Sequence, residues 1–168
     1  VAETMQGLPL EGISVSIGTK PFTEQYVLAH MIDQHLTALG AKVNRRASMG
    51  STIMFDAIRN STIDLYVDYA GTIYTSILKR DEQMGRGPVI AEITSYLYNE
   101  YGMLMLGRLG FENAYGFGMR RSEAERLGLH TIADLAQLDG NITLGADAEF
   151  FARPEWPSVR DAYGLDHL

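Results

Sequence analysis

The chain has 168 residues, which is the length of about one domain. Its 14 basic and 21 acidic residues give a formal net charge of −7, which argues against non-specific binding to nucleic acid or to anionic lipid, because both need basic side chains. Hydrophobic residues make up 46% of the chain, enough for a core, and the lack of cysteine excludes disulfides, thiolate chemistry and cysteine-based metal sites.

The first part of the chain alternates strand patterns with helix patterns. The predicted elements, in order, are a strand over 13–18, a helix over 23–39, a strand over 42–46, a helix over 51–58 and a strand over 63–67. We expect Thr23 to cap the first helix, and Ser51 or Thr52 to cap the second. The second helix is predicted to turn four residues inward: Ile53, Met54, Ala57 and Ile58. This β-α-β-α-β series favours an α/β fold with a parallel sheet and right-handed connections.

The second part of the chain is predicted to be less regular. We expect helices over 72–79, 89–101, 122–127 and from Thr131 to about 138, strands over 103–106, 115–119 and 142–144, and helical turns over 159–163. A change of composition over 107–113 predicts a crossover between a first lobe, 1–110, and the start of a second lobe, 111–168. Two strands after the crossover are too few to complete a sheet, so we expect a fragment of a longer two-lobed protein.

The ends of the chain allow two interpretations. The start at Val1 lacks the basic and apolar regions of an intact signal peptide, so it fits either a processed or a shortened chain. Unpaired sheet edges in such a fragment would favour dimers or swapped assemblies.

The sequence offers little enzymatic chemistry. Its histidines, His30, His35, His130 and His167, do not have the spacing of a zinc site, and no phosphate-binding loop is present. Asp64 and Asp68 flank a predicted strand without an acid or base partner, so we interpret them as solvated carboxylates. We therefore expect no catalytic residues, no metal and no cofactor.

Polar and aromatic residues gather where predicted strands end, the edge at which open α/β sheets bind ligands. Lys20, Tyr69 and Thr72 lie there in the first lobe, and Tyr115 and Arg153 lie near strands of the second. Tyrosine rings attract quaternary ammonium groups, whereas lysine, arginine and threonine suit a carboxylate. The combination predicts a zwitterionic ligand, although tyrosines at strand ends are also common as the edges of a core.

The motifs IGTKPFTEQ, MGST and IDLYVDYAGT, followed by a short N-A-Y and by E-F-F-A-R-P, occur in this order from about Ile13 to Leu165. In this they resemble the substrate-binding proteins of osmoprotectant ABC importers, which take up glycine betaine, proline betaine, choline or carnitine. The resemblance implies a two-lobed periplasmic-binding-protein fold of the second type, which closes over its ligand by a hinge. It also implies an ABC permease in the membrane as partner and a periplasmic or extracytoplasmic location.

The resemblance also assigns roles to five residues. It implies that Lys20, Thr72 and Arg153 bind the carboxylate of the ligand, and that Tyr69 and Tyr115 belong to the cage around its trimethylammonium group. One departure from the family pattern is Ala70, where threonine or serine is usual.

Each role has a simpler alternative. Lys20 can be a solvated lysine, Tyr69 can pack under the sheet edge, and Arg153 can form only an ion pair with Glu149 or Glu155. We interpret Glu24 and Gln25 as cap and surface residues, Tyr66 as structural, and Trp156 as a packing residue.

Three other classes of protein remain open. A ligand-sensing regulatory domain of the same fold would lie in a chain with a DNA-binding module. A receptor fused to its permease would carry transmembrane segments elsewhere in the gene. An enzyme on this fold is the third alternative, against which the lack of an acid–base pair speaks.

Overall fold

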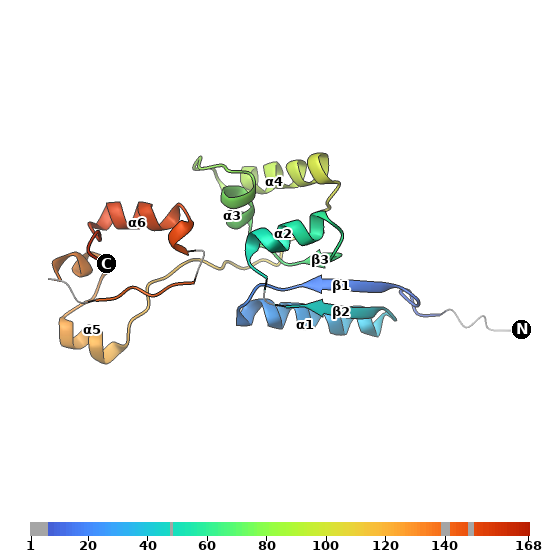
Figure 1. Cartoon of the computed structure of the whole chain (residues 1–168), viewed down its shortest axis with the longest axis horizontal. Coiled ribbons are helices and arrows are strands. Elements are labelled where there is room, and N and C mark those ends of the chain that lie inside the picture. Colours follow the sequence, from blue (N-terminus) through green and yellow to red (C-terminus); the bar gives the residue numbers. More distant parts are fainter. Residues whose placement is uncertain (1–6, 48, 139–141, 148–149) are drawn as a thin grey trace, which may run out of the picture. The chain divides into compact units, whose positions relative to one another are not determined.

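The computed structural model describes residues 7–47, 49–138, 142–147 and 150–168 (Figure 1). The chain divides into two compact units, Val1–Met105 and Leu106–Leu168, and each is described here by itself. The two lobes predicted with a boundary after residue 110 stay a prediction.

The first unit is built on a parallel sheet. Its elements are β1 (Ser14–Gly18), α1 (Thr23–Ala38), β2 (Lys42–Arg46), α2 (Ser51–Arg59) and β3 (Leu65–Tyr66). The strand order is β2-β1-β3, with Ser14 opposite Lys42 and Ile17 opposite Leu65, and both pairings are parallel. The predicted α/β fold and the predicted order of these elements are confirmed.

The strand order places the two helices on opposite faces of this sheet. From β1 the chain runs through α1 to β2 on one side, and from β2 it returns through α2 past β1 to β3 on the other. Right-handed crossovers in opposite directions put α1 and α2 on different faces, as Figure 1 shows. The carboxyl ends of β1 and β3 therefore flank a topological switch point, the place where such sheets bind ligands.

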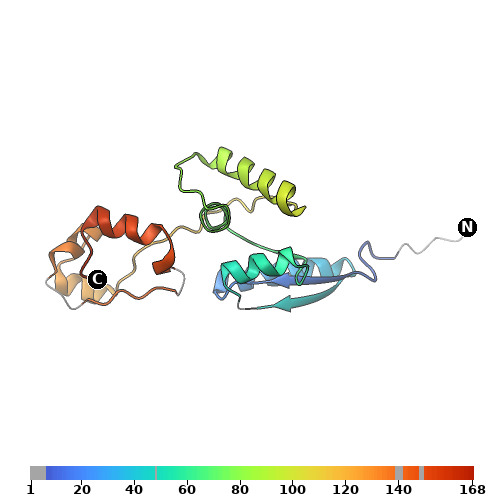
Figure 2. The same ribbon diagram turned by 45° about the horizontal axis from the view of Figure 1, so that its top comes forward.

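A second helical layer packs beyond α2. It consists of α3 (Ala70–Thr72), the π-helical segment η1 (Ile73–Ile77) and α4 (Arg86–Tyr101), with α4 alongside η1 (Figures 1 and 2). Its core contains Phe55, Ile73, Tyr74, Ile93 and Leu97. α4 begins three residues before the predicted start at Val89. Pro88 lies in its first turn, where a missing N–H costs no hydrogen bond.

The second unit is a small helical cluster. It contains α5 (Arg121–Leu127), the 3₁₀ segments η2 (Ile132–Gln137) and η3 (Phe150–Ala152), and α6 (Glu155–Tyr163). Phe150, Trp156 and Leu165 form its buried core. The packing role predicted for Trp156 is confirmed, and so is the cap at Thr131, where the side chain of Asp134 accepts the Thr131 backbone N–H at 2.7 Å.

Three predicted strands are wrong. The segments 103–106, 115–119 and 142–144 have extended or irregular backbone without sheet pairing. A strand needs a neighbour that takes its backbone hydrogen bonds, and among the described residues no strand pairs with these segments. An apolar run in the sequence indicates that a segment can form a β-strand, but it does not show whether a second strand lies beside it.

The caps, one inward face and one helix start also differ from expectation. Thr23 is the first residue of α1 rather than its cap, and Gly50, not Ser51 or Thr52, precedes α2. Ile53, predicted to face inward, is exposed, and Phe55, which directly follows the buried Met54, is buried instead. The helix predicted from residue 72 instead begins at Ala70, and its main part is the π-helical η1.

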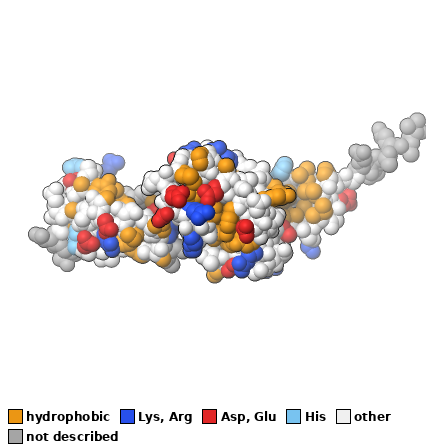
Figure 3. Space-filling view, turned by 90° about the horizontal axis from the view of Figure 1, so that it is seen from above, with side chains coloured by type: hydrophobic (Ala, Val, Ile, Leu, Met, Phe, Trp, Pro, Cys, Tyr) orange, Lys and Arg blue, Asp and Glu red, His pale blue; other side chains and the backbone are white. Residues whose placement is uncertain are grey.

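The surface mixes charges of both signs. On the face in Figure 3, acidic and basic side chains lie next to one another among apolar ones. Ion pairs at the surface of the first unit include Arg80–Glu92 and Arg45–Asp33. Within the described ranges, we find no helix with both the length and the apolar character needed to cross a membrane.

We predict that Ile93→Ala destabilises the first unit by about 2–5 kcal/mol, because Ile93 is 0% exposed and its loss leaves a cavity between α4 and η1. Urea denaturation followed by circular dichroism measures this loss. Ile53→Ala is the matched control, since Ile53 is 63% exposed and its truncation should change stability by less than about 0.5 kcal/mol. Equal effects of the two substitutions would contradict the packing described here.

Candidate functional site

Lys20 and Tyr69 meet where β1 and β3 end. Lys20 follows Gly18 of β1 by two residues, and the Thr19 N–H still bonds the Arg46 carbonyl at 2.9 Å, which holds this segment to the sheet. Tyr69 follows β3 and precedes α3. The parallel register thus brings the ends of two strands, 48 residues apart in sequence, to one edge of the sheet.

The Lys20 ammonium is buried in an ion pair. Its partner is the Asp68 carboxylate, and the two side chains are only 4% and 5% exposed. Lys20 Nζ also lies 5.1 Å from the centroid of the Tyr69 ring, a cation–π arrangement. The interpretations of Lys20 as a solvated lysine and of Asp68 as a solvated carboxylate are therefore wrong. Both charges are removed from water, which they tolerate because they are paired.

Asp68 has two further contacts in this cluster. Its Oδ1 accepts the backbone N–H of Tyr69 at 2.7 Å. Burial raises the pKa of Tyr66 far above its ordinary value, and the charge of Asp68 and its hydrogen bond with the Tyr66 hydroxyl raise it further. The Tyr66 hydroxyl therefore stays protonated beside Asp68. The structural role interpreted for Tyr66 from the sequence stays a prediction. Asp68 links the end of β3 to Lys20 and to Tyr69.

The hydroxyl of Tyr69 is held by the first turn of α1. Gln25 Nε2 donates to it at 3.0 Å, and the hydroxyl donates to Glu24 Oε1 at 2.5 Å. The ring of Phe22 stacks on that of Tyr69, with centroids 6.0 Å apart and 29° between planes. Gln25 is only 1% exposed, so its interpretation as a surface residue is wrong.

The sequence contained a signal for these neighbours. Phe22, Glu24 and Gln25 belong to the segment that joins β1 to the first turn of α1, so they must lie beside the strand end that carries Lys20. Thr72, in α3 after Tyr69, is also buried. Lys20, Tyr69 and Thr72 therefore belong to one unit, and the structure brings the first two into direct contact.

The second unit contains a similar pairing of a cation with a tyrosine. Arg153 is mostly buried, and its Cζ lies 5.5 Å from the centroid of the Tyr115 ring. Tyr115 is 54% exposed, and its ring lies 5.1 Å from that of Phe150. The predicted residues Tyr115 and Arg153 thus contact each other, and the ring of Tyr115 is open to solvent on part of its surface.

Arg153 also binds Glu155, one of its predicted alternatives. Its Nη2 donates to Glu155 Oε1 at 2.6 Å, and its Nε lies 3.2 Å from Oε2. Partial burial would raise the pKa of Glu155, but the hydrogen bond with Arg153, a backbone hydrogen bond and the charge of Arg153 together hold the pKa below its usual value. The other alternative, Glu149, lies outside the described residues.

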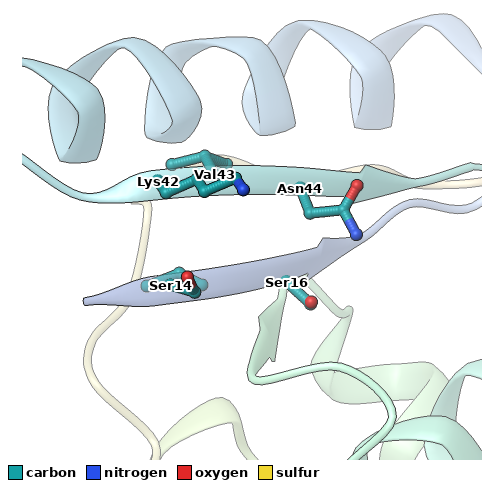
Figure 4. Close-up of a pocket in the computed structure, with 6 residues that line it drawn as sticks. Ser14, Ser16, Lys42, Val43 and Asn44 are labelled. Atoms are coloured by element: carbon teal, nitrogen blue, oxygen red, sulfur yellow. The ribbon is translucent and has the colours of Figure 1, made fainter. Parts of the chain in front are cut away.

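Two hollows of the first unit lie along the sheet. One of about 440 Å³ is lined by residues of β1 and β2, among them Ser14, Ser16 and Asn44 (Figure 4). Another of about 300 Å³ includes Thr19 and Arg45. Across the described parts of the chain, no group of three or more histidine, aspartate or glutamate side chains could hold a metal ion.

Comparison with known proteins defines the class of this one. Residues 13–168 match the family described as the substrate binding domain of the ABC-type glycine betaine transport system, so the chain belongs to this family. The resemblance inferred from the motifs is confirmed.

Curated relatives carry related names. The chain is 28% identical over 162 residues to a glycine-betaine-binding protein of Pseudomonas aeruginosa and 29% identical over 166 residues to the glycine betaine-binding protein YehZ of Escherichia coli K12. It is 28% identical over 141 residues to the ergothioneine transport permease/ergothioneine binding protein EgtU of Helicobacter pylori. These matches cover 90%, 94% and 83% of this chain.

The fold is also found in a solved structure. A crystal structure of a glycine betaine/carnitine/choline ABC transporter matches 90% of this chain and 57% of its own, with a TM-score of 0.58 and 22% identity. The chain spans about half the length of the first two relatives, 52% and 54%, and 25% of the third.

We predict that Arg153→Gln raises the pKa of Glu155, because burial then acts without the compensating cation. In the unsubstituted protein, the lowered pKa of Glu155 means that this contact stabilises the fold above the ordinary carboxyl pKa, and that the stabilisation is lost as the pH falls through the lowered value. Carboxyl ¹³C NMR titration measures the change.

The matched control is Arg126→Gln, which removes an exposed arginine paired with Glu123 of α5. This substitution should leave the titration of Glu155 unchanged. A Glu155 pKa that is the same with and without Arg153 would show that the pair does not determine it.

Proposed function

We propose that this protein is a non-catalytic solute receptor that captures a small quaternary-ammonium osmolyte and delivers it to an ABC permease on the outer side of a membrane. Glycine betaine, proline betaine, choline and carnitine are the candidate ligands. Membership of a glycine betaine transport family supports this class of function, and so do the names of the curated relatives.

The observation that carries the proposal is the ammonium group of Lys20 over the ring of Tyr69. The pair lies at the switch point between β1 and β3, where open α/β sheets bind ligands. A ring that already holds a cation at 5.1 Å has the electrostatics to attract a trimethylammonium group, and the stacked ring of Phe22 extends its aromatic surface.

The proposed ligand contacts divide by chemistry. Tyr69 and Tyr115 bind the methylated cation through their rings. Lys20, Thr72 and Arg153 bind the carboxylate, because a buried cation forms strong charge-assisted hydrogen bonds with it. The contacts of Lys20 with Tyr69 and of Arg153 with Tyr115 place a cationic group next to an aromatic ring in each unit, which is the combination that a betaine needs.

We predict that the full-length protein binds at least one member of a panel of glycine betaine, proline betaine, choline and carnitine in isothermal titration calorimetry. Ergothioneine belongs in the panel as well, because it too is a trimethylammonium carboxylate and is named for one relative. Glycine itself is the control ligand, since its ammonium group carries no methyl groups. Binding of none of the panel would refute the proposed function.

We predict that Tyr69→Ala weakens the binding of all these ligands about tenfold or more, because each loses a cation–π contact of up to about 2 kcal/mol.

Lys20→Ala should weaken betaine binding more than choline binding, since choline has no carboxylate. Calorimetry of each variant measures both effects. Tyr98→Ala, on the exposed side of α4, and Lys42→Ala, on β2, are the matched controls. Equal losses for betaine and choline in Lys20→Ala would contradict the carboxylate role of Lys20.

A second arrangement is the receptor fused to its permease. The relative from Helicobacter pylori is named for both a permease and a binding protein, and the chain matches 25% of its length. The sequence of the complete gene tests this arrangement, because a fusion would encode several transmembrane helices beside this domain.

A further inference from the structure

The carboxylate of Asp68 stands where a ligand's carboxylate is expected. The proposed function assigns Lys20 to the ligand's carboxylate, yet in the structure the Lys20 ammonium is already bound to Asp68, and both side chains are almost completely buried. We propose that Asp68 is an internal counter-ion with which a ligand carboxylate competes for Lys20. Asp68 thereby sets the preference between quaternary ammonium ligands with and without a carboxylate. This inference rests on the proposed function.

The charges around Tyr69 support this role. Lys20 lies over its ring, Glu24 accepts the hydrogen bond of its hydroxyl, and Asp68 accepts its backbone N–H. These groups carry one positive and two negative charges. Charges interact strongly where water is excluded. These three charged groups therefore attract a cationic ligand that has no carboxylate. The carboxylate of a zwitterionic ligand, in contrast, meets a lysine whose charge Asp68 already neutralises.

The geometry makes the competition direct. Lys20 Nζ lies 5.1 Å from the centroid of the Tyr69 ring, so it is within reach of the carboxylate of a ligand whose ammonium group stacks on this ring. With choline as ligand, Lys20 can keep Asp68 as its partner. With a betaine as ligand, Lys20 must turn to the new carboxylate, which leaves the buried Asp68 without its cation, and an uncompensated buried charge is unfavourable. The gain from the ligand's carboxylate is therefore partly cancelled.

Asp68→Asn tests this inference because it removes the charge and keeps the shape. The asparagine Oδ1 can still accept the Tyr69 N–H, which Asp68 accepts at 2.7 Å. We expect the ratio of the Kd for choline to the Kd for glycine betaine to rise about tenfold in the full-length protein, since close charge pairs have coupling energies of this size. Calorimetry with both ligands measures the ratio.

The matched control is Asp64→Asn, which neutralises a carboxylate at the start of the same strand. Asp64 is exposed and accepts the Ser16 N–H at 2.7 Å, a bond that asparagine can also accept. The ratio should stay at its original value in this variant. An unchanged ratio in Asp68→Asn, with both ligands affected alike, would show that Asp68 is only structural and would overturn the inference.

A second pair of variants keeps the test decisive if Asp68→Asn does not fold. Lys20→Gln leaves Asp68 as an unpaired charge beside the ligand, whereas the double variant Lys20→Gln/Asp68→Asn leaves neither charge. Glycine betaine should bind the double variant more tightly than Lys20→Gln alone, and equal binding would overturn the inference.

If the unsubstituted protein binds neither ligand, the proposed function fails and the inference fails with it. If the unsubstituted protein binds and the ratios do not move, only the inference fails.

Discussion

The ion pair between Lys20 and Asp68 is the interaction on which the candidate site depends. It joins the loop after β1 to the loop after β3, and it holds an ammonium over the Tyr69 ring in a place almost without water. A buried ion pair seldom adds much stability over an apolar pair of the same size, because desolvation cancels most of the attraction. Its presence at the switch point of the sheet, where open α/β sheets bind ligands, supports the ligand-binding role that we propose for this pair.

The rest of the first unit holds Lys20, Asp68 and Tyr69 in position. The parallel pairing of β1 with β3 brings the two loops together, and the first turn of α1 supplies Gln25 and Glu24 to the Tyr69 hydroxyl. Behind them, α2, η1 and α4 bury a shared apolar core. The second unit uses a different framework, a cluster around Trp156, to place Arg153 on Tyr115. Each unit thus combines a cation with a tyrosine on its own scaffold.

Much of the fold was predictable because it depends on local patterns. The period-two run of β1, the helical spacing of α1 and the run 42–46 identified the β-α-β-α-β order along the chain and a parallel sheet with right-handed connections. The order of the strands within the sheet, β2-β1-β3, came from the structure. The strands predicted after residue 102 failed for a physical reason. Pairing requires a partner at the right distance, and that is a property of the assembled chain. Likewise, the apolar spacing of α2 could not decide between Ile53 and Phe55, which depends on where α4 packs.

By itself, the sequence determined the class of the fold and the residue types at the strand ends, and through its motifs it pointed to the right family. The tertiary structure alone decided that Lys20 is paired with Asp68, that Gln25 is buried against Tyr69, and that Arg153 contacts both Tyr115 and Glu155. Residue spacing along a chain fixes which side chains can reach one edge of a sheet. Which of them neutralise one another depends on distances and exclusion of water, and these exist only once the strands and helices have packed.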